Sequence, residues 1–573
     1  MSTIKPLLLS STFVLSLLCG FGETVIGQNK SAVVQGALVQ EGTLRIPLDE
    51  PYSQYTRLLQ LSGLGSSHTS FFLRPVEVRV DGDAEHPWAD QIGYEPLWEF
   101  EKLGLSANLL DPAYYSSVNS NLPTGGNDGA LWQGRGLNQS LTVGVSASFG
   151  PIHIQLKPVL VRSENLEFPL YSGNRSVYEY PYVGYVQRFG SESFSEVNLG
   201  DSFAALRLLG LEASVGNERI WIGPSTTYPM LFGSNAPGFL HGRVGTYKPL
   251  NIWLGHVEGH YMFGKLESSE YSSIHTRSLN TVMASFSPRW IPGLSLGAQR
   301  VFVDFYPESL RDLIFYENIF QVFLKYKLAD EETGDDGSQP DNQIVTLFGR
   351  WAFPEYQFEM YGTFGVNDHR TDARDTRAHP DHASGWNFGV MKLFERTSKE
   401  WVSVNFEVTE LEDTRTSIAR GWPNPNRWSS VPFTNHSRNP FNHRGTPIGS
   451  MVGPGGNAVT VKINAYNSNG LLGLRLNRHS YMNSLLHNST LFNGFSTFRN
   501  LDPANAGTSA QDLRQVEYQV AGEMTRFLPW YGMELDLGLE YTYRMNHNFV
   551  YQNDIGNWRF SMSLRKRFGG QRW

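Results

Sequence analysis

The sequence predicts an all-β protein, a transmembrane antiparallel β-barrel of about 18 strands with a small, partly helical N-terminal periplasmic or plug element. Three observations predict this class. The chain begins with the features of a secretory signal peptide. Apolar and polar residues then alternate in segments of about ten residues, the length of a tilted membrane-spanning strand. The connections between these segments are of two kinds, short turns and long polar loops.

Composition is compatible with this class and excludes others. The 573 residues include 56 glycines and 13% aromatic residues, too many for a helical bundle. The mean hydropathy of -0.32 is that of a soluble chain. A membrane barrel gives the same value because only alternate residues of each strand face lipid. A net charge of -8 is mild for this length and argues against nucleic acid as a partner.

Residues 1–27 are predicted to be the signal peptide. One lysine precedes the apolar stretch Pro6–Gly22, and the short residues around Gly27 permit cleavage there. Cys19, the only cysteine, lies inside this segment; Leu18 before it fits a lipoprotein signal poorly. The exported chain would have no disulfides. No later stretch holds about 18 apolar residues, so export leaves a soluble protein or an outer-membrane barrel.

Residues 28–135 are predicted to form the N-terminal element. Ser53–Gly65 could be a short amphipathic helix that ends at a glycine, and Glu95–Leu105 has no extended alternation. We expect this region to lie below the barrel or inside it.

Residues 136–573 are predicted to form the barrel with its long extracellular loops. Clear alternation occurs in Leu141–Phe149, Met533–Arg544 and Trp558–Phe568. A soluble sandwich also alternates, but its strands are usually shorter. Lys and Arg mostly occupy the polar positions of these alternating segments, as expected if those positions face a water-filled lumen. The last strand ends at either Phe568 or Trp573.

The connections predict the orientation of the barrel. Phe149–Ile152 and Trp290–Leu294 read as tight turns, whereas Asn367–Gly385, Glu412–Gly445 and Asn483–Gln515 are long and polar. Outer-membrane barrels have short periplasmic turns and long extracellular loops. The long loops are therefore predicted to face outside.

The stretch GNDGALWQGRG (Gly126–Gly136) could be a phosphate-binding loop, but it lacks the P-loop lysine. We interpret it as the junction at which the N-terminal element leads into the first barrel strand. Its glycines then serve backbone geometry, and Trp132 and Arg135 pack against the barrel interior.

The stretch Asn217–Pro249 allows two interpretations. It could be a structured loop folded into the lumen. Alternatively, Trp221, Tyr228 and Asn235 could line a sugar path, because aromatic rings stack on sugars and amides bind hydroxyl groups. The residue types alone leave both open.

The outward loops supply the candidate binding residues. Trp422–Ser430 and Phe441–Gly445 combine Trp, Asn, Arg and His, a set that suits an acidic polysaccharide but also any exposed, rigid loop. The candidate polysaccharide-binding residues are Trp422, Trp428, Arg438, His443 and Arg444. Asp368–His382 is rich in His and Asp, but its spacings match no metal motif and its arginines would oppose a cation. No catalytic motif, cofactor or metal site is predicted.

Four motifs in order resemble the Wzi capsule-assembly family of outer-membrane proteins, in its Bacteroidetes-like form. They are NDGALWQGRGLN, ERIWIGPSTTYPMLFGSNAPGF, EMYGTFGVNDH with PDHASGWNFG, and FNHRGTPIGSMVGPGGN. The resemblance implies an 18-stranded barrel with a helical element at its periplasmic end. It also implies a lectin-like, non-enzymatic role in holding exported capsular polysaccharide on the cell surface.

The predicted location is thus the outer membrane of a Gram-negative-type bacterium. The expected partners are capsular or other surface polysaccharide, outer-membrane lipid and the barrel-assembly machinery, with no nucleic acid. Two alternatives remain, a sugar-permissive porin and an outer-membrane hydrolase. A porin requires an open lumen, and a hydrolase requires one essential acidic or serine residue, to which no motif points.

Overall fold

The computed structural model describes residues 43–46, 48, 52–65, 68–79, 85–91, 98–100, 104–169, 192–268, 275–307, 309, 342–367, 377, 378, 380, 381, 383–412, 440–453, 455–480, 503–509 and 512–567. The predicted signal peptide and the predicted end of the last strand lie outside these residues.

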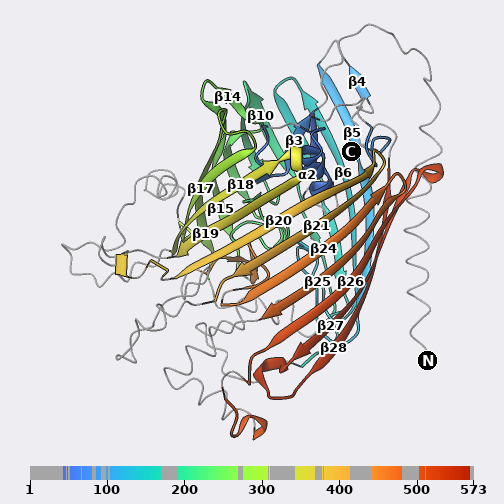
Figure 1. The fold of residues 1–573 in the computed structure, drawn as a ribbon, viewed down its shortest axis with the longest axis vertical. Helices are drawn as coiled ribbons and strands as arrows, with labels where there is room; N and C mark the ends of the chain where they lie inside the picture. The colour runs from blue at the N-terminus through green and yellow to red at the C-terminus, as the bar shows by residue number, and fades with distance from the viewer. Residues whose placement is uncertain are drawn as a thin grey trace.

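A closed antiparallel barrel dominates the molecule (Figure 1). Its strands are β5 (Leu105–Asn119), β6 (Gly136–Phe149), β7 (Ile152–Leu156) with β8 (Val159–Ser163), β9 (Phe194–Asn198) with β10 (Phe203–Leu208), β11 (Leu211–Gly216), β13 (His241–Thr246) with β14 (Leu250–Ile252), β15 (Gly255–Leu266), β16 (Arg277–Pro288), β17 (Leu294–Phe305), β18 (Asn342–Phe353), β19 (Phe358–Asn367), β20 (Ser384–Thr397), β21 (Glu400–Glu410), β24 (Asn457–Asn467), β25 (Gly470–Ser480), β26 (Val516–Leu528), β27 (Met533–Met545) and β28 (Ile555–Lys566).

These segments make 18 barrel strands. The sheet has 22 segments, but β7–β8, β9–β10 and β13–β14 are each one strand with a break, and the short β4 (Trp98–Phe100) only flanks β5. The pairing of β28 with β5, from Arg559 opposite Asn119 to Arg565 opposite Ala113, closes the ring. The structure confirms the predicted barrel and its strand number.

The two faces of the barrel wall have opposite chemistry. On β27, Leu539 is 53% exposed on the outside, whereas Glu540 and Thr542 on the inside are 5% and 0% exposed. The same alternation holds on β6, where Val145 is exposed on the outside and Gly144 and Ser146 beside it face inward. The outer face is thus an apolar belt suited to lipid. Among the described residues no helix combines the length and the apolar character needed to cross a membrane.

The two ends of the barrel also differ. At one end, which we call the short-turn end, hairpins close with turns such as the 3-10 segments η3 (Pro354–Tyr356) and η5 (Pro529–Tyr531). Aromatic side chains stand exposed on these turns, including Trp253 at 85% and Trp530 at 92%. At the other, long-loop end, the connections are long. This arrangement confirms the predicted division into tight turns and long loops.

The barrel begins earlier than the sequence predicted. The first barrel strand is β5, which starts at Leu105, so the predicted boundary between residues 135 and 136 is wrong. The reason is local, because the register of β5 against β6 shifts between Leu110 and Ala113. Asp111 and Pro112 lie in this bulge, and proline cannot donate a backbone hydrogen bond, so the alternation breaks there.

The N-terminal element enters the barrel at the short-turn end. The helix predicted within Ser53–Gly65 is confirmed as α2 (Tyr52–Leu61), and Gly63 follows it with a φ of +80°. All ten residues of α2 are buried, because the helix lies within the ring of strands (Figure 1). Two small sheets accompany it, β1 (Thr43–Ile46) with β3 (Val76–Arg79), and β2 (Leu73–Arg74) with β12 (Trp221–Ile222).

Two apolar clusters fill one side of the lumen. One packs α2 and Trp88 against Trp401, Tyr466 and Phe527 near the short-turn end. The other packs residues 220–239 against the inner faces of β15 to β18, including Met262, Met283 and Phe348. The hydrophobic core of this protein therefore lies inside the barrel.

Candidate functional site

Four segments meet inside the barrel, and we call them together the lumen plug. They are the N-terminal plug (52–65, 68–74 and 85–91), the glycine loop (Gly126–Gly136), the inward loop (Asn217–Leu240) and the mouth loop (440–453 with 455–456). The last three come from connections at the long-loop end and fold back between the strands. Each contacts at least one of the others, so the plug is one assembly built from distant parts of the sequence.

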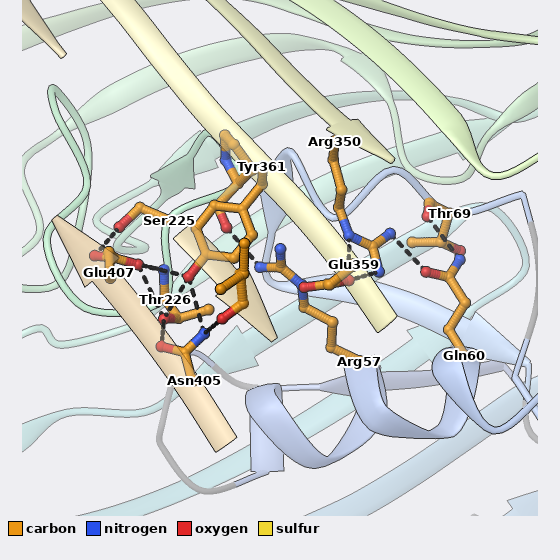
Figure 2. Close-up of polar contacts among 12 residues, drawn as sticks. Arg57, Gln60, Thr69, Ser225, Thr226, Arg350, Glu359, Tyr361, Asn405 and Glu407 are labelled. Carbon is orange, nitrogen blue, oxygen red and sulfur yellow. Dashed lines mark hydrogen bonds and ion pairs between the residues drawn. The ribbon is translucent and has the colours of Figure 1, made fainter. Parts of the chain in front are cut away.

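Glu407 on β21 anchors the inward loop. Its carboxylate, drawn with Thr226 in Figure 2, accepts the backbone N–H of Thr226 at 2.8 Å. It also accepts the backbone N–H groups of Thr227 and Tyr228 at 3.2 and 2.9 Å. It also accepts the hydroxyls of Ser225, Thr226 and Tyr361 at 2.7, 3.0 and 2.9 Å. The side chain is fully buried. Six donors replace the water that this charge loses, so the loop conformation and the carboxylate stabilise each other.

A cluster of ion pairs anchors α2 to the barrel wall. Arg57 Nε lies 2.6 Å from Glu359 Oε1, and Arg350 Nε donates to the other oxygen at 2.8 Å (Figure 2). Gln60 accepts from Arg350 at 2.6 Å. Both members of the Arg57–Glu359 pair are at most 1% exposed. Buried charges of this kind persist only with partners in place, so the polar face of α2 is matched to the barrel wall.

The N-terminal plug and the inward loop contact each other directly. The backbone N–H of Gly223 donates to Phe72 O at 2.8 Å, and Arg74 donates to the carbonyls of Gly223 and Ser225 at 3.1 and 2.6 Å. The Arg74 guanidinium lies 4.5 Å from the ring centre of Trp221. The two segments thus meet inside the barrel and are held together by hydrogen bonds and by a cation–π contact.

The glycine loop belongs to the plug and not to a strand junction, because it connects β5 and β6 at the long-loop end. Gly129 has a φ of +62°, and its N–H donates to Ser234 O at 2.8 Å. A side chain on Gly126 would meet the sulfur of Met451. The interpretation of this stretch as a junction is therefore wrong. The prediction that its glycines are required by the backbone conformation agrees with the positive φ of Gly129 and with the lack of space beside Gly126.

The mouth loop covers the inward loop. Gly233 N–H donates to Ile448 O at 3.1 Å, Asn235 donates to Pro447 O at 3.0 Å, and the rings of Phe232 and Phe441 pack edge to face. From the wall, Arg277 on β16 binds Pro440 O and Asn442 Oδ1, each at 2.8 Å. These contacts fix residues 440–448 deep in the mouth.

Several predicted residues are therefore packed inside the plug. Trp221 and Tyr228 are 4% and 3% exposed, so a sugar ring has no face of either to stack on. Trp221 donates to Ser225 O at 3.1 Å, and the Tyr228 hydroxyl accepts from Asn477 at 2.8 Å. Of the two interpretations of this stretch, the loop folded into the lumen describes the observed arrangement.

Trp132 and Arg135 lie at the rim of the mouth. Trp132 donates to Asn165 Oδ1 at 3.0 Å, and Arg135 donates to the carbonyls of Ser120 and Glu167. Both side chains remain partly exposed. These bonds join neighbouring connections at the long-loop end.

The two predicted binding residues in the mouth loop differ from each other. His443 is 3% exposed, and its Nδ1 accepts the N–H of Glu267 at 3.0 Å. Burial lowers the pKa of His443 to about 3, so the ring is neutral and does not supply a cation for an acidic sugar. Arg444 is partly exposed and pairs with Glu196, with one contact at 3.0 Å. Trp422, Trp428 and Arg438 lie outside the described residues.

Sequence patterns missed the residues that hold the plug, namely Arg57, Glu359 and Glu407. Glu359 and Glu407 occupy inner positions of alternating strands, where any polar residue fits the pattern. The alternation pattern therefore gave no signal that separates these carboxylates from lumen-facing polar residues that meet water. In the described parts of the chain, no group of three or more His, Cys, Asp or Glu side chains is arranged to hold a metal ion.

Comparisons with known proteins agree with this architecture. The family model of the capsule assembly protein Wzi matches residues 123–557. Among curated proteins, no sequence matches at a significant level. A solved structure of Wzi, described as a carbohydrate-binding β-barrel involved in group 1 capsule assembly in Escherichia coli, is similar with a TM-score of 0.55 and 14% identity. The match covers 92% of this chain and 99% of that one.

A second similar structure is a BenF-like porin from Pseudomonas fluorescens Pf-5. It matches with a TM-score of 0.38 and 12% identity, over 80% of this chain and 98% of that chain.

Proposed function

Because the chain belongs to the capsule assembly protein Wzi family, we propose that it binds exported capsular polysaccharide and helps to assemble or anchor the capsule at the cell surface. The family match spans nearly the whole barrel and contains all four motifs that the sequence presented. The related Escherichia coli barrel is described as binding carbohydrate, which supports polysaccharide as the partner of this chain.

The observation that carries this proposal is the closed lumen. The inward loop and α2 are buried and locked to the wall through Glu407, Glu359 and Arg57. Across the described residues, polymer or free sugar therefore has no open passage through this side of the barrel. A sugar-permissive porin needs such a passage, so the closed lumen favours binding at the surface over diffusion.

The apolar outer face and the two kinds of connection support an outer-membrane location, with the short turns in the periplasm and the long loops outside. Polysaccharide then meets the protein at the long-loop end. We propose Trp422, Trp428 and Arg438 as contacts, with Arg444 as a secondary one through its exposed part. His443 is withdrawn from this set because of its burial. Many weak contacts along one polymer would add up to retention.

Deletion of the gene in its host tests the proposal. Polysaccharide is then assayed in washed cells and in the culture medium. We expect polymer to move from cells to medium at constant total amount, with restoration by the wild-type chain. An unchanged distribution with reduced uptake of small sugars would replace the proposal with the porin alternative. Breakdown of purified polymer by the protein would replace it with the hydrolase.

A triple variant, Trp422→Ala with Trp428→Ala and Arg438→Ala, then tests the site. The matched control is Trp253→Ala with Trp530→Ala, which removes exposed tryptophans from the short-turn end. We expect only the triple variant to release polymer while both proteins reach the membrane in equal amounts. Equal retention by the two variants would move the binding site elsewhere on the long-loop end.

A further inference from the structure

Among the residues that the structure describes, the plug does not fill one side of the lumen. On the inner faces of β25 and β26, the side chains of Arg475 and Glu523 are 19% and 45% exposed. On β28, the Arg559 side chain is 15% exposed, and the inward-facing Ser561 and Ser563 are also partly exposed. These residues lie within the closed ring and away from lipid, so their exposed surface faces a space inside the barrel.

The lining of this space is polar and small. On β6, the inward-facing positions from Ser140 to Ser148 are Ser, Thr or Gly, and all are partly exposed. The charged side chains on β25 to β27 are paired with one another. Arg475 Nε donates to Glu523 Oε1 at 3.3 Å, and Arg475 Nη2 donates to Glu540 Oε2 at 2.8 Å. A polar space that is wide enough and rich in donors and acceptors holds water, whereas an apolar one stays dry.

A layer of amides closes this space at the long-loop end, and we call it the amide seal (Asn119, Thr124, Gln133, Asn138 and Asn557). The side chain of Asn119 donates to three carbonyls of the β5–β6 connection, each at 3.1 Å. Asn557 Oδ1 accepts the N–H groups of residues 121 and 122 at 2.8 and 3.0 Å. The members of the seal are at most 6% exposed.

The other end of the space is covered unequally. The N-terminal plug covers β25 to β28 there, because Trp88 packs against Phe527 of β26 and Arg567 Nη1 donates to Gln91 Oε1 at 2.6 Å. On β6 and β7 exposure continues to Ser148 and His153, which contact each other at 2.8 Å near the short-turn end. On β6 and β7 the inward-facing residues are thus buried toward the long loops and stay partly exposed toward the short turns.

We propose that the barrel contains a water-filled chamber along the inner faces of β25 to β28 and β5 to β7, which admits small hydrophilic solutes and ions from the short-turn end and is closed to the cell exterior by the amide seal. The chamber is separate from the polysaccharide site proposed above. The seal is thin compared with the rest of the plug, and its removal connects the two sides of the membrane.

Cysteine labelling tests the chamber itself. The single cysteine, Cys19, lies in the predicted signal peptide, so the exported protein offers no competing thiol. Ser146→Cys and Ser561→Cys are treated in detergent solution with a small cationic methanethiosulfonate. We expect both to be modified, whereas two other variants stay unmodified: Thr542→Cys, which is buried opposite Asn557 of the amide seal, and the lipid-facing Val145→Cys. Protection of both chamber cysteines in the folded barrel would show that the space is dry and would overturn the proposal.

Single-channel conductance in planar bilayers tests the seal. We expect the wild type to be silent and Asn119→Ala with Asn557→Ala to conduct, with Asn121→Ala at the exposed rim as matched control. A second variant, in which a short Gly-Ser turn replaces residues 123–134, should conduct more strongly. Arg57→Met, which loosens the other closure, should remain silent. Conductance by Arg57→Met and silence of both seal variants in folded barrels would overturn the proposal. Neither result affects the test of polymer retention.

Discussion

The two sides of the lumen are occupied in different ways. Along β15 to β21, the inner wall meets the N-terminal plug and the inward loop, and residues such as Met283 and Glu407 are at most 1% exposed. We call this the packed side. Along β25 to β28 and β5 to β7, the wall carries serines, glycines and paired charges that remain partly exposed. We call this the chamber side.

The difference shows where the stability of the plug arises. On the packed side the buried charges of Glu407, Arg57 and Glu359 have specific partners from another segment, so removal of one member leaves others desolvated and unpaired. On the chamber side water can replace a lost partner. Equivalent substitutions should therefore cost much more on the packed side, and the following predictions test this contrast from the largest effect to the smallest.

The largest effect is expected for Glu407→Ala. Three backbone N–H groups of the inward loop lose their acceptor in a place that water does not reach. We expect a loss of about 3–6 kcal/mol in the free energy of unfolding, measured from urea unfolding in detergent or liposomes. Glu523→Ala on the chamber side is the matched control and should cost under about 1 kcal/mol. Equal losses for the two variants would remove the distinction between the sides.

Arg57→Met should have the next largest effect, because Glu359 then keeps only Arg350 as a cationic partner. Breaking a buried ion pair costs about 3 kcal/mol or more. Adding Glu359→Gln to Arg57→Met should recover part of this loss, and a double-mutant cycle measures the coupling. Additive losses would show that the two side chains act independently.

A pair of glycine substitutions should give a smaller contrast. A Cβ on Gly238 in the inward loop would lie 1.7 Å from the backbone oxygen of Asn217, which cannot move alone. A Cβ on Gly538 would meet the Ser561 hydroxyl at 2.4 Å, and that side chain can rotate into the chamber. We expect Gly238→Ala to cost about 2 kcal/mol and Gly538→Ala well under about 1 kcal/mol, measured as above.

The smallest effect is a pH dependence of the packed side. Burial lowers the pKa of His86 in the N-terminal plug to about 4, whereas an unfolded histidine has a pKa near about 6.5. Between these two pKa values the unfolded chain binds a proton at His86 and the folded protein does not. The free energy of unfolding is therefore highest above pH 6.5 and decreases as the pH drops toward 4. His86→Gln should flatten this fall in unfolding midpoints between pH 7 and 5. An unchanged slope would assign the acid sensitivity to other histidines, such as His547.

The sequence alone predicted the parts of this protein that depend on local patterns. The alternation in Met533–Arg544 predicted strand β27 to within one residue of its observed end, and the helix within Ser53–Gly65 was predicted from its amphipathic spacing and its terminal glycine. Strand length and connection length then implied a membrane barrel and its orientation. These features follow from backbone geometry and from the chemistry of lipid and water, which act on neighbouring residues.

Only the tertiary structure decided how the barrel is closed. Glu407 meets the N–H groups of Thr226 to Tyr228, and Arg57 meets Glu359, across separations that no local period encodes. The same holds for the glycine loop, whose place in the plug depends on Met451 and Ser234. A lumen-facing polar residue satisfies the alternation pattern whether it faces water, a loop or a helix. The role of such a residue therefore depends on which segment packs against it in the folded barrel.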